Sequence, residues 1–192
     1  VQQATGSLEV GLSYNIAGMK LSVTYHLIKA RVSQAEGEDK LPDALRTLEM
    51  AMKLPGIRVE LDTAGSKARG QRAVTTGERV SVFLELAAVH WKMGNQAEST
   101  KVMQDALAAF ANTPEESRVV IANADLCLQR GDVDGAIRML QSIGESASYY
   151  IQSKEKMAYI HLDHETKVKD TCAKWSDSLP AHPSSWDGRD RR

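Results

Sequence analysis

A small residue recurs at a nearly constant interval along the C-terminal half of this chain. The steps from Ala87 to Ala124 and from Ala124 to Ala158 are roughly 37 and roughly 34 residues, close to a known helical repeat length. Each alanine stands in a stretch whose apolar residues follow the i, i+3, i+4, i+7 spacing of an amphipathic helix. A repeat of this length constrains the whole architecture, because it requires one structural unit to be built again and again.

Each interval contains two helical stretches separated by a glycine. In the unit that begins at Ser81, Gly94 separates the two stretches and Pro114 closes the unit. In the next unit the break falls at Gly131. The spacing matches the tetratricopeptide pattern of about 34 residues, in which each unit is a helical hairpin. The sequence therefore predicts an all-α solenoid of stacked hairpins, an α-α superhelix.

An earlier hairpin is expected from Tyr25 to Gly56, with Ala30 on its first helix. Its second helix is predicted to start after Pro42. The step from Ala30 to Ala87 is roughly 57 residues, so about 20 residues are inserted between the two hairpins. The predicted organisation is the end of a preceding helix and one hairpin at 1–57, a flexible insertion loop at 58–79, two hairpins and a further partial one at 80–172, and a disordered tail at 173–192.

Stacking is required because a hairpin of two amphipathic helices leaves one apolar face bare until the next hairpin covers it. Small residues allow neighbouring helices to approach closely, whereas extra methylenes would force them apart. The residues expected to pack the repeats are Ala30, Ala44, Leu48, Phe83, Leu86, Ala87, Ala106, Ala124, Ala136, Leu140 and Ala158.

Composition and motifs argue against several other classes of function. The net charge is −1, which gives no general attraction to nucleic acid, and no apolar run is long enough to insert into a membrane. The two cysteines have no metal-site spacing, and no phosphate-binding or nucleophile motif is present. We therefore expect no enzyme, no metal, no cofactor and no small-molecule substrate.

Several short segments go beyond the general repeat pattern. They are Tyr25 to Ala30, Leu48 to Gly56, Lys101 to Ala106, Ile121 to Leu126 and Glu155 to Ala158. These segments resemble the tetratricopeptide repeat protein 21 family, the long repeat subunits of intraflagellar transport complex A, over roughly Leu8 to Cys172. The resemblance implies a role in retrograde ciliary transport and cilium assembly, with other subunits of the complex as partners. It also implies a location in the cytoplasm and cilium, at the ciliary base and axoneme.

Family members are far longer than this chain, which also begins at Val1 rather than at a methionine. We therefore expect the chain to be part of a longer protein or a truncated product. Unlike the family, residues 174–192 do not show the pattern of a further helix pair.

Two kinds of binding are compatible with such a stack. In the first, the chain is a scaffold whose concave face holds other proteins. In the second, it is an adaptor that captures the carboxylate tail of a partner, which needs a cluster of basic and amide side chains on the first helices. The first helices offer Lys29, Arg31, Lys92, Asn123, Lys154 and Lys156, which are not spaced as one clamp. Trp91 is expected either to pack between hairpins or to contact a partner.

Overall fold

The computed structural model describes residues 1–58 and 73–163, and within these ranges every regular element is a helix. The helices are α1 (Gln2–Tyr14), α2 (Ile16–Lys20), α3 (Val23–Glu36), the short 3₁₀ helix η1 (Glu38–Lys40), α4 (Leu41–Met52), α5 (Thr76–Lys92), α6 (Gln96–Ala109), α7 (Glu116–Gln129) and α8 (Val133–Gln141). A last helix, here called the C-terminal helix, runs from 150 to 163, the final described residue. The tail predicted at 173–192 lies outside the described residues.

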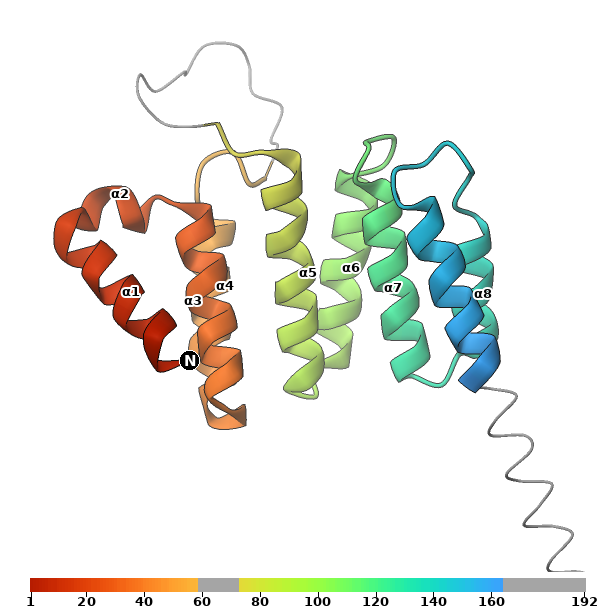
Figure 1. Ribbon diagram of the computed structural model, residues 1–192, viewed down its shortest axis with the longest axis horizontal. Coiled ribbons are helices and arrows are strands. Elements are labelled where there is room, and N and C mark those ends of the chain that lie inside the picture. The colour runs from red at the N-terminus through yellow and green to blue at the C-terminus, as the bar shows by residue number, and fades with distance from the viewer. Residues whose placement is uncertain (59–72, 164–192) are drawn as a thin grey trace, which may run out of the picture.

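The helices form a single row of antiparallel pairs (Figure 1). In each pair the earlier helix packs against the later one: α3 against α4, α5 against α6, and α7 against α8. The first helix of a pair also packs against the second helix of the pair before it, as α5 does on α4 and α7 on α6. This arrangement is the predicted all-helical solenoid.

Glycines separate the two helices of the second and third hairpins, as the sequence predicts. Gly94 and Gly131 each lie two residues beyond the end of a first helix and have φ values of 79° and 83°. Glycine adopts this left-handed conformation without the steric cost that a Cβ would add. In the first hairpin, α4 begins at Leu41, so Pro42 lies in its first turn rather than before it. A proline is tolerated there because its missing N–H would have no partner within the helix.

The first-helix alanines of the three hairpins lie in the apolar core. Ala30, Ala87 and Ala124 are 0%, 1% and 0% exposed. In the second hairpin, the Ser99 hydroxyl of α6 donates a hydrogen bond of 2.8 Å to the Ala87 carbonyl of α5. Such a short contact leaves no room for a larger side chain at either position.

Ten of the eleven expected packing residues are buried, namely Ala30, Ala44, Leu48, Phe83, Leu86, Ala87, Ala106, Ala124, Ala136 and Leu140. Ala158 differs, because it is exposed on the C-terminal helix. The second helices α4, α6 and α8 follow their first helices in the chain, and the described residues end at 163, the last residue of the C-terminal helix.

The helix α5 begins earlier than the sequence predicts. Residues 59–72 lie outside the described part of the chain, but Thr76 to Glu78, expected in the loop, form the first turn of α5. A capping box formed by Thr75 and Glu78 fixes the start of α5. The Thr75 hydroxyl accepts from the Glu78 N–H at 3.2 Å, and the Glu78 carboxylate accepts from the Thr75 N–H at 2.9 Å. Both contacts satisfy donors that a helix N-terminus otherwise leaves unpaired.

We expect Thr75→Ala to lower the free energy of unfolding by about 1 kcal/mol, because it removes the oxygen that caps α5. Chemical denaturation measures this loss. Thr75→Ser keeps the hydroxyl and should restore wild-type stability, whereas equal losses in both variants would show that the cap is not the cause.

The N-terminal segment also differs from the expected end of one helix. It forms two helices, α1 and α2, and neither contains a buried residue. Their contacts are with each other and with α3. They therefore lie at one end of the stack without joining the core (Figure 1).

Candidate protein-interaction surface

The first helices of successive hairpins share a register, and this register defines a series of equivalent grooves. Gln34, Trp91 and Leu128 each stand four residues after the alanine of their own helix. Each of the three faces the next first helix along the row, through the contacts described below. The side chain at this position decides whether the groove between two neighbouring first helices is closed or open.

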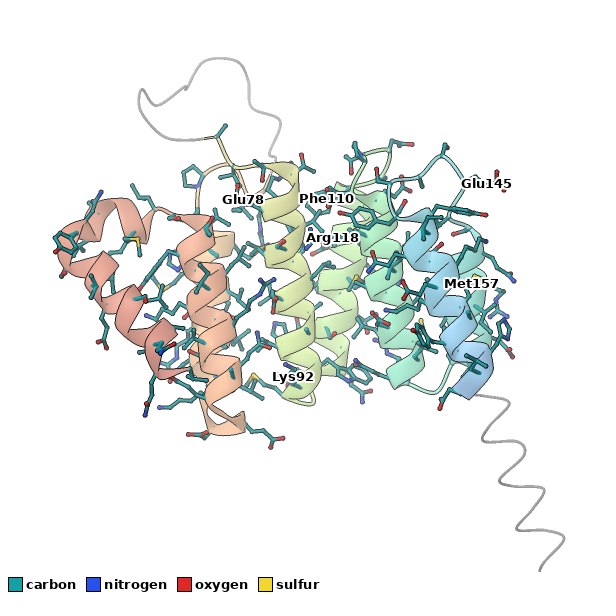
Figure 2. The ribbon with its side chains drawn as sticks, in the orientation of Figure 1. Glu78, Lys92, Phe110, Arg118, Glu145 and Met157 are labelled. Carbon is teal, nitrogen blue, oxygen red and sulfur yellow. The ribbon has the colours of Figure 1, made fainter. Side chains whose placement is uncertain are left out.

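The groove between α3 and α5 is closed by polar contacts. The Glu85 carboxylate of α5 accepts from Arg31 Nε at 2.6 Å and from Gln34 Nε2 at 3.0 Å. Lys92 Nζ, at the lower end of α5 in Figure 2, donates to Gln34 Oε1 at 2.8 Å. At the other end of the helices, Thr24 donates to Glu78 at 2.9 Å. These contacts tie α3 to α5 along their whole length.

The groove between α5 and α7 is open in its lower part. Trp91 is half-buried there and lines a cavity of about 220 Å³ together with Leu84, Ala88, Ala122 and Gln129, among others. The Arg130 guanidinium lies over the Trp91 ring, 5.3 Å from its centroid. Trp91 thus packs against the core, which is the first of the two expectations, and it also borders a surface cavity, whereas its contact with a partner stays a prediction.

The upper part of the same interface is held by Arg118 of α7 (Figure 2). Its Nη2 donates to the Ser81 hydroxyl at 2.9 Å, and its Nη1 donates to the Gly77 carbonyl at 3.4 Å and to the Glu115 carboxylate at 3.3 Å. Ser81 and Gly77 both belong to α5, so this one guanidinium fixes the spacing of two hairpins.

The third groove lies between α7 and the C-terminal helix. It holds a cavity of about 490 Å³ whose apolar lining comes from Leu128, Val133, Tyr159 and Ile160. Its polar rim is formed by Gln152, Glu155, Lys156 and Asp163. An apolar floor with a polar rim is the usual composition of a site that binds part of another molecule.

The basic residues that could have formed a carboxylate clamp already have partners within the chain. Arg31 pairs with Glu85, Lys92 with Gln34, and Lys156 donates to both carboxylate oxygens of Asp125. Lys29 and Lys154 lie over the rings of Tyr25 and Tyr150, and Asn123 Nδ2 donates to Met139 Sδ at 3.4 Å. No common site brings these six side chains together.

Comparison with known proteins places this row of helices in a family. A family model described as the tetratricopeptide repeat protein 21 ARM repeat matches residues 19–173. The chain belongs to the tetratricopeptide repeat protein 21 family. Among its relatives, mouse tetratricopeptide repeat protein 21B is 46% identical over 164 residues, which are 85% of this chain and 12% of the relative.

Other members of the tetratricopeptide repeat protein 21 family match at similar coverage. Human tetratricopeptide repeat protein 21A is 42% identical over 155 residues, covering 81% of this chain and 11% of the relative. The Caenorhabditis elegans homolog is 33% identical over 167 residues, covering 86% of this chain and 12% of the relative. The chain therefore spans about an eighth of the length of these curated relatives.

The polar contacts between first helices do not follow from the repeat pattern of this family member. Glu78, Glu85 and Lys92 are spaced seven residues apart on α5, and Thr24 and Arg31 are seven apart on α3. Because seven residues correspond to about two helical turns, such residues share one face of a helix. Heptad spacing of polar residues on two successive first helices is the signal that could have predicted them.

Several apolar side chains stay exposed at both ends of the described stack. On α1, on α2 and just after α2 they are Val10, Tyr14, Ile16 and Leu21, and on the C-terminal helix they are Ile151, Tyr159 and Leu162. Clusters of exposed apolar side chains mark surfaces that contact other proteins. Within the described residues, no helix is long and apolar enough to cross a membrane.

The described residues contain no group of three or more His, Cys, Asp or Glu side chains that could hold a metal ion. Burial, together with the nearby Asp132 carboxylate, raises the pKa of the Cys127 thiol against the opposing effect of Arg130. A thiol with a raised pKa is mostly protonated at neutral pH and therefore a poor nucleophile.

Proposed function

We propose that this chain is a non-catalytic protein–protein interaction scaffold and forms part of intraflagellar transport complex A. In this proposal it acts in retrograde ciliary transport and cilium assembly, and it works in the cytoplasm and cilium, at the ciliary base and axoneme. Its partners are other protein subunits of that transport complex. The family to which the chain belongs and its helical repeats support a scaffold, and the resemblance noted in the sequence motivates the finer role.

The observation that carries the proposal is the row of first helices held in fixed register by Glu85 and Arg118, with apolar cavities left open beside Trp91 and Leu128. A fixed surface with apolar anchoring points binds protein segments well, because little conformational entropy is lost on binding. Capture of a carboxylate tail is the weaker candidate, because the basic side chains that it needs are occupied.

The test is affinity purification of the chain from ciliated cells, followed by mass spectrometry of the proteins recovered with it. We expect other subunits of the transport complex to copurify. Changing Leu128 and Tyr159 to Gln together should reduce their recovery by at least about tenfold, since a few central apolar residues usually dominate an interface.

The matched control is Met50→Gln, which makes the same kind of change at an exposed position on α4. It should leave recovery unchanged. A monodisperse monomer that brings down no ciliary transport protein would remove the support for the proposal.

A further inference from the structure

The third groove has an apolar floor that another molecule can reach. Leu128 of α7 and Val133 at the start of α8 are half-buried there, and Tyr159 of the C-terminal helix is 64% exposed. The cavity of about 490 Å³ is within the usual size range of binding pockets. Figure 1 shows the C-terminal helix in blue beside α7. The floor of this groove therefore suits a large apolar side chain of a partner.

The charge of the one basic side chain on the rim is offset within the chain. Among the described residues that line the groove, Lys156 is the only basic one. Its Nζ donates to both carboxylate oxygens of Asp125 on α7. Asp125 itself lines the neighbouring cavity beside Trp91, so the ion pair lies between the two cavities. A carboxylate of a partner would have to displace Asp125 to reach Lys156.

A carboxylate on the same rim has no such partner. Glu155 lines the groove and makes no hydrogen bond or ion pair with any described residue. Both of its neighbours in the chain are lysines, but each is engaged elsewhere. Lys156 binds Asp125, and Lys154 Nζ lies 5.0 Å from the centroid of the Tyr150 ring. The charge that Glu155 gives to the rim is therefore negative and available to a cation.

The start of α8 brings further negative charge to the groove. Asp132 and Asp134 are both exposed, and they flank Val133 in the chain. The basic residue of the turn between α7 and α8 is Arg130, whose guanidinium lies 5.3 Å from the centroid of the Trp91 ring and so faces the second hairpin. Carboxylates thus border the apolar floor both on the C-terminal helix and at the start of α8.

We propose, building on the scaffold function above, that this groove holds a partner segment in which a large apolar side chain is flanked by lysine or arginine. The apolar side chain enters the cavity beside Leu128 and Tyr159, and the cation pairs with Glu155. Complementary charge at a rim speeds association and fixes orientation, whereas like charge acts against wrong partners. A segment with acidic residues in the same places is therefore rejected.

The first test is an NMR titration of the full chain, with isotope-labelled methyl groups, against a short synthetic peptide of leucines flanked by lysines. The comparison peptide has glutamate in place of every lysine. We expect the lysine peptide to shift the methyl signals of Leu128, Val133 and Ile160, which line the groove. The glutamate peptide should bind at least about tenfold more weakly. Equal binding of the two peptides, or no shift of these signals with either at about millimolar concentration, would overturn the proposal.

The second test is the same titration with Glu155→Gln. The substitution should weaken binding of the lysine peptide about twofold to fivefold, the effect of one ion pair near solvent, and added salt should weaken binding to the unchanged chain as well. Glu155 is exposed, so the melting temperature should stay the same. Glu49→Gln makes the identical change at an exposed position on α4 and should leave the affinity unaltered.

Undiminished binding to Glu155→Gln would show that the groove does not select a partner by its charge. The scaffold function would survive that result, because recovery of the transport-complex subunits tests it separately. Conversely, loss of that recovery would not explain a difference between the lysine and glutamate peptides, which are measured on the purified chain.

Discussion

Phe110→Ala is expected to lower the free energy of unfolding by about 3–5 kcal/mol, the usual cost of removing a buried phenylalanine side chain. Phe110 is 0% exposed, and its ring meets that of Phe83 edge to face, with centroids 5.5 Å apart. On another side the Arg79 guanidinium lies 5.2 Å from the ring centroid. The same arginine donates to the Ile57 carbonyl at 3.0 Å, after the first hairpin. Phe110 therefore packs against α5 at the upper end of the second hairpin (Figure 2), and Arg79 links this packing to the segment after the first hairpin.

Urea denaturation followed by circular dichroism measures this loss. The matched control is Tyr14→Ala, which removes an aromatic side chain that is 86% exposed on α1. It should change stability by less than about 0.5 kcal/mol. If both variants lost the same stability, Phe110 would not be the packing centre that its burial indicates.

Ala124→Leu should destabilise the chain by about 1–3 kcal/mol through overpacking. Ala124 is 0% exposed on α7, and the opposing Ala136 on α8 is also 0% exposed, so the added methylenes have no space to enter. The two helices must separate or the leucine must adopt a strained rotamer. The melting temperature should fall by several degrees for a chain of this size.

The control for this change is Ala108→Leu, the same substitution at an exposed position of α6. Leucine and alanine have similar helix propensities, so Ala108→Leu should leave the melting temperature nearly unaltered. If Ala108→Leu lowered the melting temperature as much as Ala124→Leu, the destabilisation would come from leucine itself and not from overpacking between α7 and α8.

The hairpins could be predicted because the sequence repeats one physical requirement. The small residues Ala87 and Ala124 and the glycines Gly94 and Gly131 recur at one interval along the chain. Few structures other than a repeated helical hairpin explain such a recurrence. The exposure of Ala158 could not be predicted from its own position, because burial there depends on a helix elsewhere in the chain. Periodicity identifies which face a residue occupies, but another segment decides whether that face is covered.

The start of α5 shows a second limit of pattern reasoning. Residues 75–78 contain glycine and few apolar side chains, so their composition predicts a loop, although the spacing of Thr75 and Glu78 is that of a capping box. The heptad spacing of Glu78, Glu85 and Lys92 marks a polar face of α5, but it does not identify the partners of Glu85, and Arg118 on α7 is not part of it. A charged side chain on a helix has many possible partners, and only the stacking of the hairpins brings Arg31, Gln34 and Ser81 within reach.

The closed groove between α3 and α5 has a mechanical consequence. Its contacts are ion pairs and hydrogen bonds near solvent, with the Arg31 side chain 57% exposed and that of Glu85 20% exposed. Exposed pairs of this kind contribute only about 0.2–1 kcal/mol each, and water readily replaces them. The apolar core below them joins α3, α4 and α5 in one buried cluster. The stack should thus keep the spacing of its hairpins through this core, so that loss of a single contact at the rim of the groove leaves the neighbouring hairpins in place.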